Sequence, residues 1–117
     1  MNPPDQPGAD ANLSKILDQM WARFLPDMRD RISVLEAAAA AAAANRLSAQ
    51  QREDAHATAH KLAGALGTFG LMRGTDLARR FESEFSGEPG PDQSQGKALV
   101  AVAAEIRAMI ENRKSSA

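Results

Sequence analysis

The two histidines of the chain, His56 and His60, lie in the stretch that combines a reactive side chain with closely spaced glycines. Apolar residues there have the three- and four-residue spacing of a helix with one buried stripe, formed by Ala55, Ala59, Leu62, Leu66 and Phe69. At about 100° per residue, His60, Gly64 and Gly67 fall on the opposite side of that helix. A glycine inside a helix costs about 1 kcal/mol relative to alanine, so this pair predicts an exposed face that another molecule approaches closely.

Two kinds of chemistry suit an exposed imidazole, because its neutral form offers a nitrogen lone pair as a nucleophile or as a metal ligand. The metal hypothesis depends on His56 and His60, which are four residues apart on one side of the helix, with Glu53 one turn earlier. With no cysteine and no third histidine in the chain, any further ligands would be carboxylates. The alternative without chemistry is that both histidines are ordinary surface residues.

Composition narrows the classes of function. A chain of 117 residues predicts one domain, with room for a core but not for a sizeable enclosed substrate cleft. A net charge of −1 argues against nucleic acid and anionic membranes as partners, because both need clustered lysine and arginine. The chain lacks cysteine, a secretory signal and an apolar run of the ~20 residues that span a bilayer, so we expect a cytoplasmic protein.

The N-terminal quarter predicts a leader and one short helix. Residues 1–11 are rich in proline and aspartate and predict a disordered leader. The apolar residues of segment 13–24 have helical spacing, and either Asp10 or Asn12 is a suitable N-cap. Pro26 disfavours helical geometry in the residue before it and suits a first helical turn, so it predicts the end of this helix and the start of a second.

The remaining segments predict four longer helices. The second helix extends through the eight alanines of 37–44, because alanine has the highest helix propensity. The third begins after Ser48, which with Gln51 has the form of a capping box, and stops at Gly70. A fourth helix and a glycine- and proline-rich loop at 87–91 follow. The last helix covers about 92–112, and residues 115–117 should fray. The expected inward residues of the second, fourth and last helices are Met28, Ile32, Leu35, Ala39, Ala42, Leu77, Ala78, Phe81, Phe85, Leu99, Val102, Ile106, Met109 and Ile110.

These elements predict an all-α fold. No stretch alternates in the manner of a strand, and four long amphipathic faces with short connections are typical of an antiparallel four-helix bundle. We therefore expect such a bundle over residues 12–114, with the additional short N-terminal helix packed as a cover.

One segment, Ala59-His60-Lys61-Leu62-Ala63-Gly64, is followed by Gly67 and Gly70 and then by Leu77 and Glu82. With this spacing it resembles the signature of histidine phosphotransfer (HPt) domains, the monomeric helical carriers of bacterial two-component phosphorelays. The turn formed by residues 67–70 is also similar to that in the phosphotransfer domains of chemotaxis kinases.

The resemblance implies that His60 accepts a phosphoryl group from an aspartyl phosphate on a receiver domain and passes it to another receiver. It implies that Glu82 accepts a hydrogen bond from the imidazole, which leaves the other ring nitrogen as the nucleophile. An ordinary solvated glutamate is the alternative for Glu82. The residues expected on the receiver docking face are Gly64, Gly67, Ala63, Ala57 and Arg79.

One position departs from the family pattern. The family commonly has a lysine three residues after the histidine, where this chain has Ala63. We expect Lys61, with Arg79 on the following helix, to supply the positive charge beside the phosphoryl group.

The resemblance also implies partners and cofactors. We expect receiver domains of response regulators and a hybrid histidine kinase as partners of a monomeric chain, with Mg²⁺ supplied by the receiver and no cofactor or metal on this chain. No nucleotide-binding glycine loop occurs, so we expect a carrier without ATP-dependent kinase activity. The alternative function is a module that docks receivers without accepting phosphate.

Overall fold

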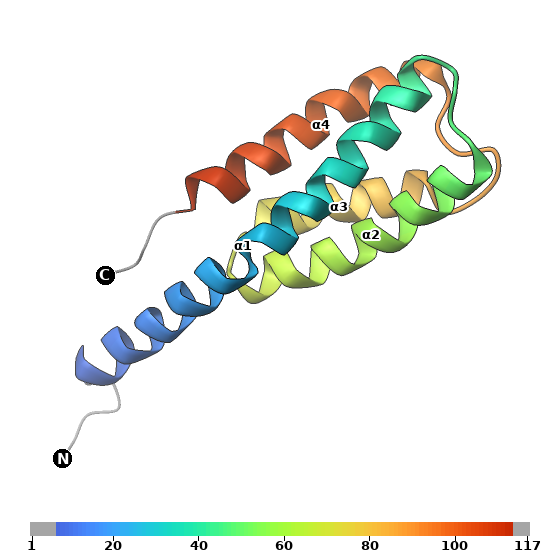
Figure 1. Ribbon diagram of the computed structural model, residues 1–117. Coiled ribbons are helices and arrows are strands. Elements are labelled where there is room, and N and C mark those ends of the chain that lie inside the picture. The colour runs from blue at the N-terminus through green and yellow to red at the C-terminus, as the bar shows by residue number, and fades with distance from the viewer. Residues whose placement is uncertain (1–6, 114–117) are drawn as a thin grey trace.

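The computed structural model describes residues 7–113, and within that range it contains four α-helices and no strand (Figure 1). Consecutive helices run in opposite directions, α1 contacts both α2 and α4, and α3 packs mainly on α2 and also on α4. The predicted all-α, antiparallel four-helix bundle is confirmed. The helices are α1 (Pro7–Ala43), α2 (Ala49–Thr68), α3 (Met72–Glu84) and α4 (Gln93–Asn112).

The predicted helix break at Pro26 is wrong, because α1 continues through this residue. Proline has no N–H for the carbonyl of Ala22, but both residues face solvent, where water can bond that carbonyl. Trp21 before the proline and Met28 after it are both buried in the core. Packing on both sides of Pro26 therefore favours one continuous helix, and the expected short N-terminal helix is the first part of α1.

The start of α1 also differs from the prediction. The helix begins at Pro7, so neither Asp10 nor Asn12 is its N-cap, and the part of the expected leader from residue 7 onward is helical. Residues 1–6 of that leader, and residues 115–117 that were expected to fray, lie outside the described residues.

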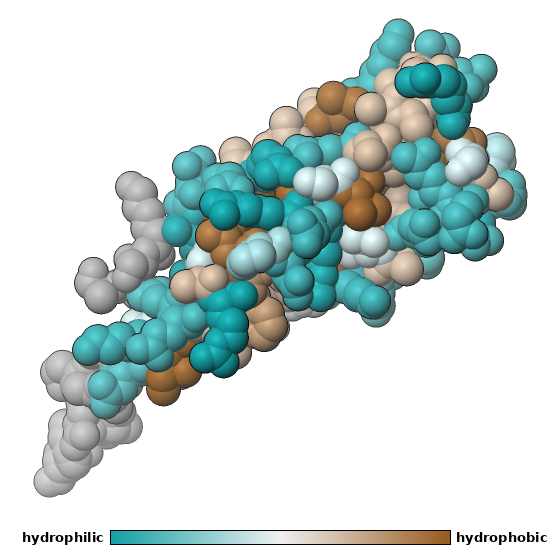
Figure 2. Space-filling model, viewed as in Figure 1, coloured by the Kyte–Doolittle hydropathy of each residue, from teal (hydrophilic) through white to brown (hydrophobic). Residues whose placement is uncertain are grey.

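The first part of α1 extends beyond the other helices (Figure 1). Its apolar residues were expected to be buried, yet Leu13 is 57% and Ile16 52% exposed. Figure 2 shows hydrophobic side chains on the surface of this projecting part. No other described helix packs against this projecting part of α1. Among the described side chains of α1, Trp21 is the first buried apolar one.

The core lies between the four helices and contains the predicted inward stripes of α2, α3 and α4. Leu77 and Met109 are only partly buried. The alanines of α1 lie where α4 comes close, since a Cβ added to Gly96 would lie 2.7 Å from the carbonyl carbon of Ala42. The alanine run is therefore a close helix contact. The largest fully buried side chains are Phe81, Phe85, Met28, Ile32, Leu35, Leu62, Leu66, Leu99, Ile106, Ile110 and Thr75.

Local signals set the ends of the helices. Asn45 adopts a left-handed conformation (φ 58°) after α1, and Ser48 caps α2 by accepting a hydrogen bond from the backbone N–H of Gln51. Gly70 (φ 78°) follows the C-cap of α2 and allows the N–H of Leu71 to bond the carbonyl of Leu66. The predicted cap by the Ser48 side chain and the stop at Gly70 are confirmed, but only the Ser48 half of the predicted capping box is present. None of the helices within residues 7–113 is long and apolar enough to cross a membrane.

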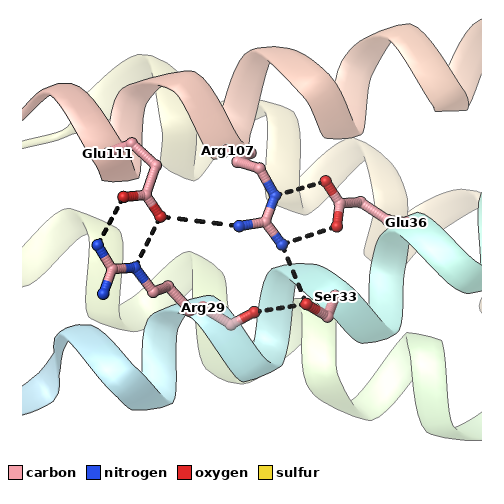
Figure 3. Close-up of polar contacts among 5 residues, drawn as sticks. All are labelled: Arg29, Ser33, Glu36, Arg107 and Glu111. Carbon is pink, nitrogen blue, oxygen red and sulfur yellow. Dashed lines mark hydrogen bonds and ion pairs between the residues drawn. The ribbon is translucent and has the colours of Figure 1, made fainter.

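A network of charged side chains joins α1 to α4 on the surface (Figure 3). Arg29 donates two hydrogen bonds to Glu111, at 2.7 and 2.8 Å. Arg107 donates two to Glu36, at 2.6 and 2.8 Å, and a further one to the hydroxyl of Ser33. The hydrogen bond from Arg29 lowers the pKa of the Glu111 carboxyl below its ordinary value.

Replacing Glu111 by glutamine should lower the thermal midpoint at pH 7 by a few degrees at most, because an exposed ion pair contributes little. A carboxyl with a lowered pKa in the folded state stabilises the fold above the unfolded pKa of about 4.3, and this contribution disappears as pH falls through the folded pKa. The difference between wild type and Glu111→Gln, measured by thermal melts, should therefore shrink below about pH 4. Asp30→Asn, outside this network, is the control. A difference that stays constant down to pH 2 would contradict the prediction.

Candidate functional site

The site is formed by one helical hairpin. His60 lies on α2 and Glu82 on α3, and the connection between the two helices consists only of residues 69–71. Burial of Ala59 and Leu62 turns His60 outward, and burial of Phe81 and Phe85 leaves Glu82 at the edge that faces α2. The helix stripes predicted from sequence therefore place both side chains at the α2–α3 boundary.

His60 and Glu82 form a hydrogen bond of 2.7 Å between the imidazole Nδ1 and the carboxylate Oε2. A carboxylate only accepts, so Nδ1 carries the proton and donates it. The His60 side chain is 73% exposed, whereas that of Glu82 is 28% exposed. The second ring nitrogen, Nε2, is consequently the one with a lone pair available to a visiting molecule.

Gly64 and Gly67 have different surroundings. Gly64 is exposed, and a Cβ added there would have no neighbour within 4 Å. A Cβ on Gly67 would lie 3.3 Å from the hydroxyl oxygen of Thr75 on α3. Gly64 thus leaves the surface beside His60 flat. Gly67 was predicted on the same exposed face, but it is half-buried and lets α3 approach α2.

Ala57 and Arg79, expected on the docking face, are exposed, and so is Lys61, which was expected to supply charge beside the phosphoryl group. Lys61 directly follows His60, and Arg79 precedes Glu82 by nearly one helical turn on α3. The placement of Ala63 on this face is wrong, because it is 3% exposed and belongs to the core. Ala63 lies on the side of α2 that packs against α3, where its carbonyl accepts a hydrogen bond from buried Thr75.

His56 lies one turn before His60 and is half-buried. Its Nδ1 is 2.9 Å from the backbone carbonyl oxygen of Glu82, to which it donates a hydrogen bond. This arrangement does not support the metal hypothesis, because His56 points at α3 and uses its Nδ1 to bond the Glu82 carbonyl. Within the described part of the chain, no group of three or more His, Asp or Glu side chains could hold a metal ion.

Sequence reasoning missed an open hollow of about 250 Å³ between α1 and the end of α2. This hollow lies next to Gly64. Thr68, which lines the hollow, donates a hydrogen bond to the carbonyl of Gly64. Phe24 was expected to be buried but lines this hollow. Only the packing of α1 on α2 reveals it. The lining residues are Met20, Phe24, Met28, Arg31, Ala65, Thr68 and Phe69.

Two of the comparisons with known proteins found a match. The family model described as "Hpt domain" matches residues 19–116. The chain is 38% identical over 66 residues to Protein RcaC of Microchaete diplosiphon, an alignment that covers 56% of this chain and 10% of RcaC. The chain thus covers only about a tenth of that relative's length. No solved structure matches the chain.

Proposed function

The chain belongs to the Hpt domain family, a family of phosphohistidine carrier modules in phosphorelays, and from this premise we propose that His60 is the residue that carries the phosphoryl group. In this proposal His60 accepts the group from an aspartyl phosphate on a receiver domain and passes it to a second receiver. The hydrogen bond between His60 and Glu82 on an otherwise exposed imidazole is the observation that supports it most directly.

The transfer step requires little of this chain. The lone pair of His60 Nε2 attacks phosphorus, an N–P bond forms, and the P–O bond to the receiver's aspartate breaks, which releases the aspartate as a carboxylate. The ring gains positive charge as the bond forms, while the proton stays on Nδ1. The carboxylate of Glu82, 2.7 Å from Nδ1, stabilises that charge and fixes the ring orientation. The return step, to a second receiver, reverses these changes.

The receiver supplies the remaining chemistry in this proposal. Mg²⁺ bound by the receiver would supply positive charge to the phosphoryl oxygens. The open surface at Gly64 lets the receiver approach His60 closely. The chain therefore acts as a carrier and needs no nucleotide site of its own.

The proposal is tested by phosphate labelling. Receiver domains from the same organism are phosphorylated with radiolabelled acetyl phosphate and Mg²⁺ and mixed with this protein. We expect acid-labile, alkali-stable label on wild type and on His56→Asn, and none on His60→Gln. If a receiver binds, but no receiver transfers label to the wild type, the proposal is overturned in favour of a docking module.

Lys61 is proposed to attract the phosphoryl oxygens, with help from Arg79. Both side chains are exposed, and an exposed charge pair contributes up to about 1 kcal/mol, a factor of roughly five in rate. Lys61→Ala should therefore slow transfer about three- to fivefold in single-turnover labelling, and the double change with Arg79→Ala should slow it more. Lys97→Ala removes an exposed lysine of α4 and is the control. An unchanged rate in Lys61→Ala would exclude this role.

A further inference from the structure

Glu82 is held by both histidines of the chain. His60 Nδ1 donates to its carboxylate, and His56 Nδ1 contacts its backbone carbonyl oxygen at 2.9 Å. The two histidines are one turn apart on α2. His60 bonds the side chain of Glu82 on α3, and His56 bonds its main chain. The site as proposed above uses only the first of these contacts.

The carbonyl of Glu82 needs a donor from outside α3. This helix ends at Glu84, so its last four carbonyls have no partner from a continuing helix. The N–H of Phe85 bonds the carbonyl of Phe81, and the N–H of Ser86 bonds that of Ser83 instead of Glu82. His56 supplies the missing donor from the neighbouring helix, in a half-buried position where an unpaired carbonyl is costly.

Both bonds to Glu82 come from α2. The imidazole of His60 is mostly exposed, and an exposed side-chain pair is only weakly held by itself. This pair is favoured when the backbone of Glu82 is held close to α2, and the core packing of α3, the Thr75 bond and the His56 bond all contribute to that. A bond from α2 to the carbonyl of Glu82 fixes the end of α3 from which that carboxylate projects.

We propose that His56 is a positioning residue for the phosphoacceptor. It holds the main chain of Glu82, Glu82 in turn holds the proton on His60 Nδ1, and Nε2 is kept as the nucleophile. The proposal depends on the proposed function for its consequence in transfer, but its structural part concerns the protonated ring nitrogen of His60 in the unphosphorylated protein.

The test compares His56→Leu with His56→Asn, because the asparagine amide nitrogen occupies nearly the position of histidine Nδ1 and keeps the donor. The ring-nitrogen chemical shifts of His60, measured by long-range proton–nitrogen NMR, report which nitrogen carries the proton. We expect His56→Leu to shift His60 from the Nδ1–H toward the Nε2–H form and to slow transfer about three- to tenfold. His56→Asn should match wild type within about twofold.

Two further variants separate positioning from general stability. Thr75→Val removes another hydrogen bond between α3 and α2, 2.9 Å long and directed to Ala63, and should lower the thermal midpoint without changing the His60 tautomer. In a Glu82→Ala background, His56→Leu should have no further effect on that tautomer, because its effect passes through Glu82.

A folded His56→Leu protein with the wild-type His60 tautomer would overturn the inference, and so would an equal tautomer change in Thr75→Val. Because the NMR measurement uses no phosphate, it judges the role of His56 even if labelling shows that His60 is not phosphorylated. Failure of the proposed function and failure of this inference are thus distinguishable.

Discussion

Gly64→Phe should fold as wild type does and lose phosphoryl transfer by at least about 100-fold. The residue lies one turn after His60 on the exposed side of α2, and nothing lies within 4 Å of an added Cβ. The new ring therefore costs the fold little, but it covers the surface next to His60. In-line transfer needs the reacting atoms about 3–3.5 Å apart, and a misplacement of about 1 Å costs roughly 100-fold in rate.

Two other variants make this measurement specific. Gly64→Ala should stabilise the protein by up to about 1 kcal/mol through helix propensity and reduce transfer much less than phenylalanine does. Gly87→Phe adds the same ring at another open glycine, in the loop after α3, and should leave transfer unchanged. Thermal melts and single-turnover labelling supply both readouts. Wild-type transfer by Gly64→Phe would show that the receiver does not approach across this face.

Gly96→Ala should have the opposite pattern, with a lower stability and normal transfer in the folded protein. A Cβ at this position would overlap the backbone nitrogen of Ala43 and lie 2.7 Å from the carbonyl carbon of Ala42. Both atoms belong to the backbone of α1, so no side-chain rotation relieves the overlap and α4 must move away. We expect a loss of about 2 kcal/mol and a thermal midpoint roughly 8–15 °C lower.

Gly64→Ala is the matched control for this change, since it is the same substitution in another helix of the bundle. The two variants should shift the midpoint in opposite directions. Labelling well below the midpoint should give Gly96→Ala a rate within about twofold of wild type, because the substitution is at the α1–α4 contact. A midpoint equal to or above that of wild type would show that α1 and α4 do not depend on this close approach.

Much of the fold was predictable because the governing signals are local. The spacing of Ala59, Leu62 and Leu66 determines which side of α2 is buried, and so turns His60 outward. Ser48 and Gly70 act through hydrogen bonds within a few residues of the helix ends. The partnership of His60 with Glu82 was expected from the family resemblance, and the hydrogen bond between them is present.

The wrong predictions concern features that depend on packing between helices. Pro26 has a local preference for a helix start, but burial of Trp21 and Met28 on either side favours one helix. Ala63 was placed on the docking face by the family resemblance, whereas the contact with α3 buries it. The bond from His56 to Glu82 depends on where α3 ends, which the sequence pattern does not specify closely enough.

The three-residue connection between α2 and α3 has a consequence for how this chain can vary. Since His60 and Glu82 project from opposite arms of one hairpin, the length of that connection helps to set their register. An inserted residue there would rotate one arm against the other, while the longer segment between α3 and α4 could absorb a change in length without disturbing the pair. The proposed chemistry is in this sense tied to the shortest of the three connections between the described helices.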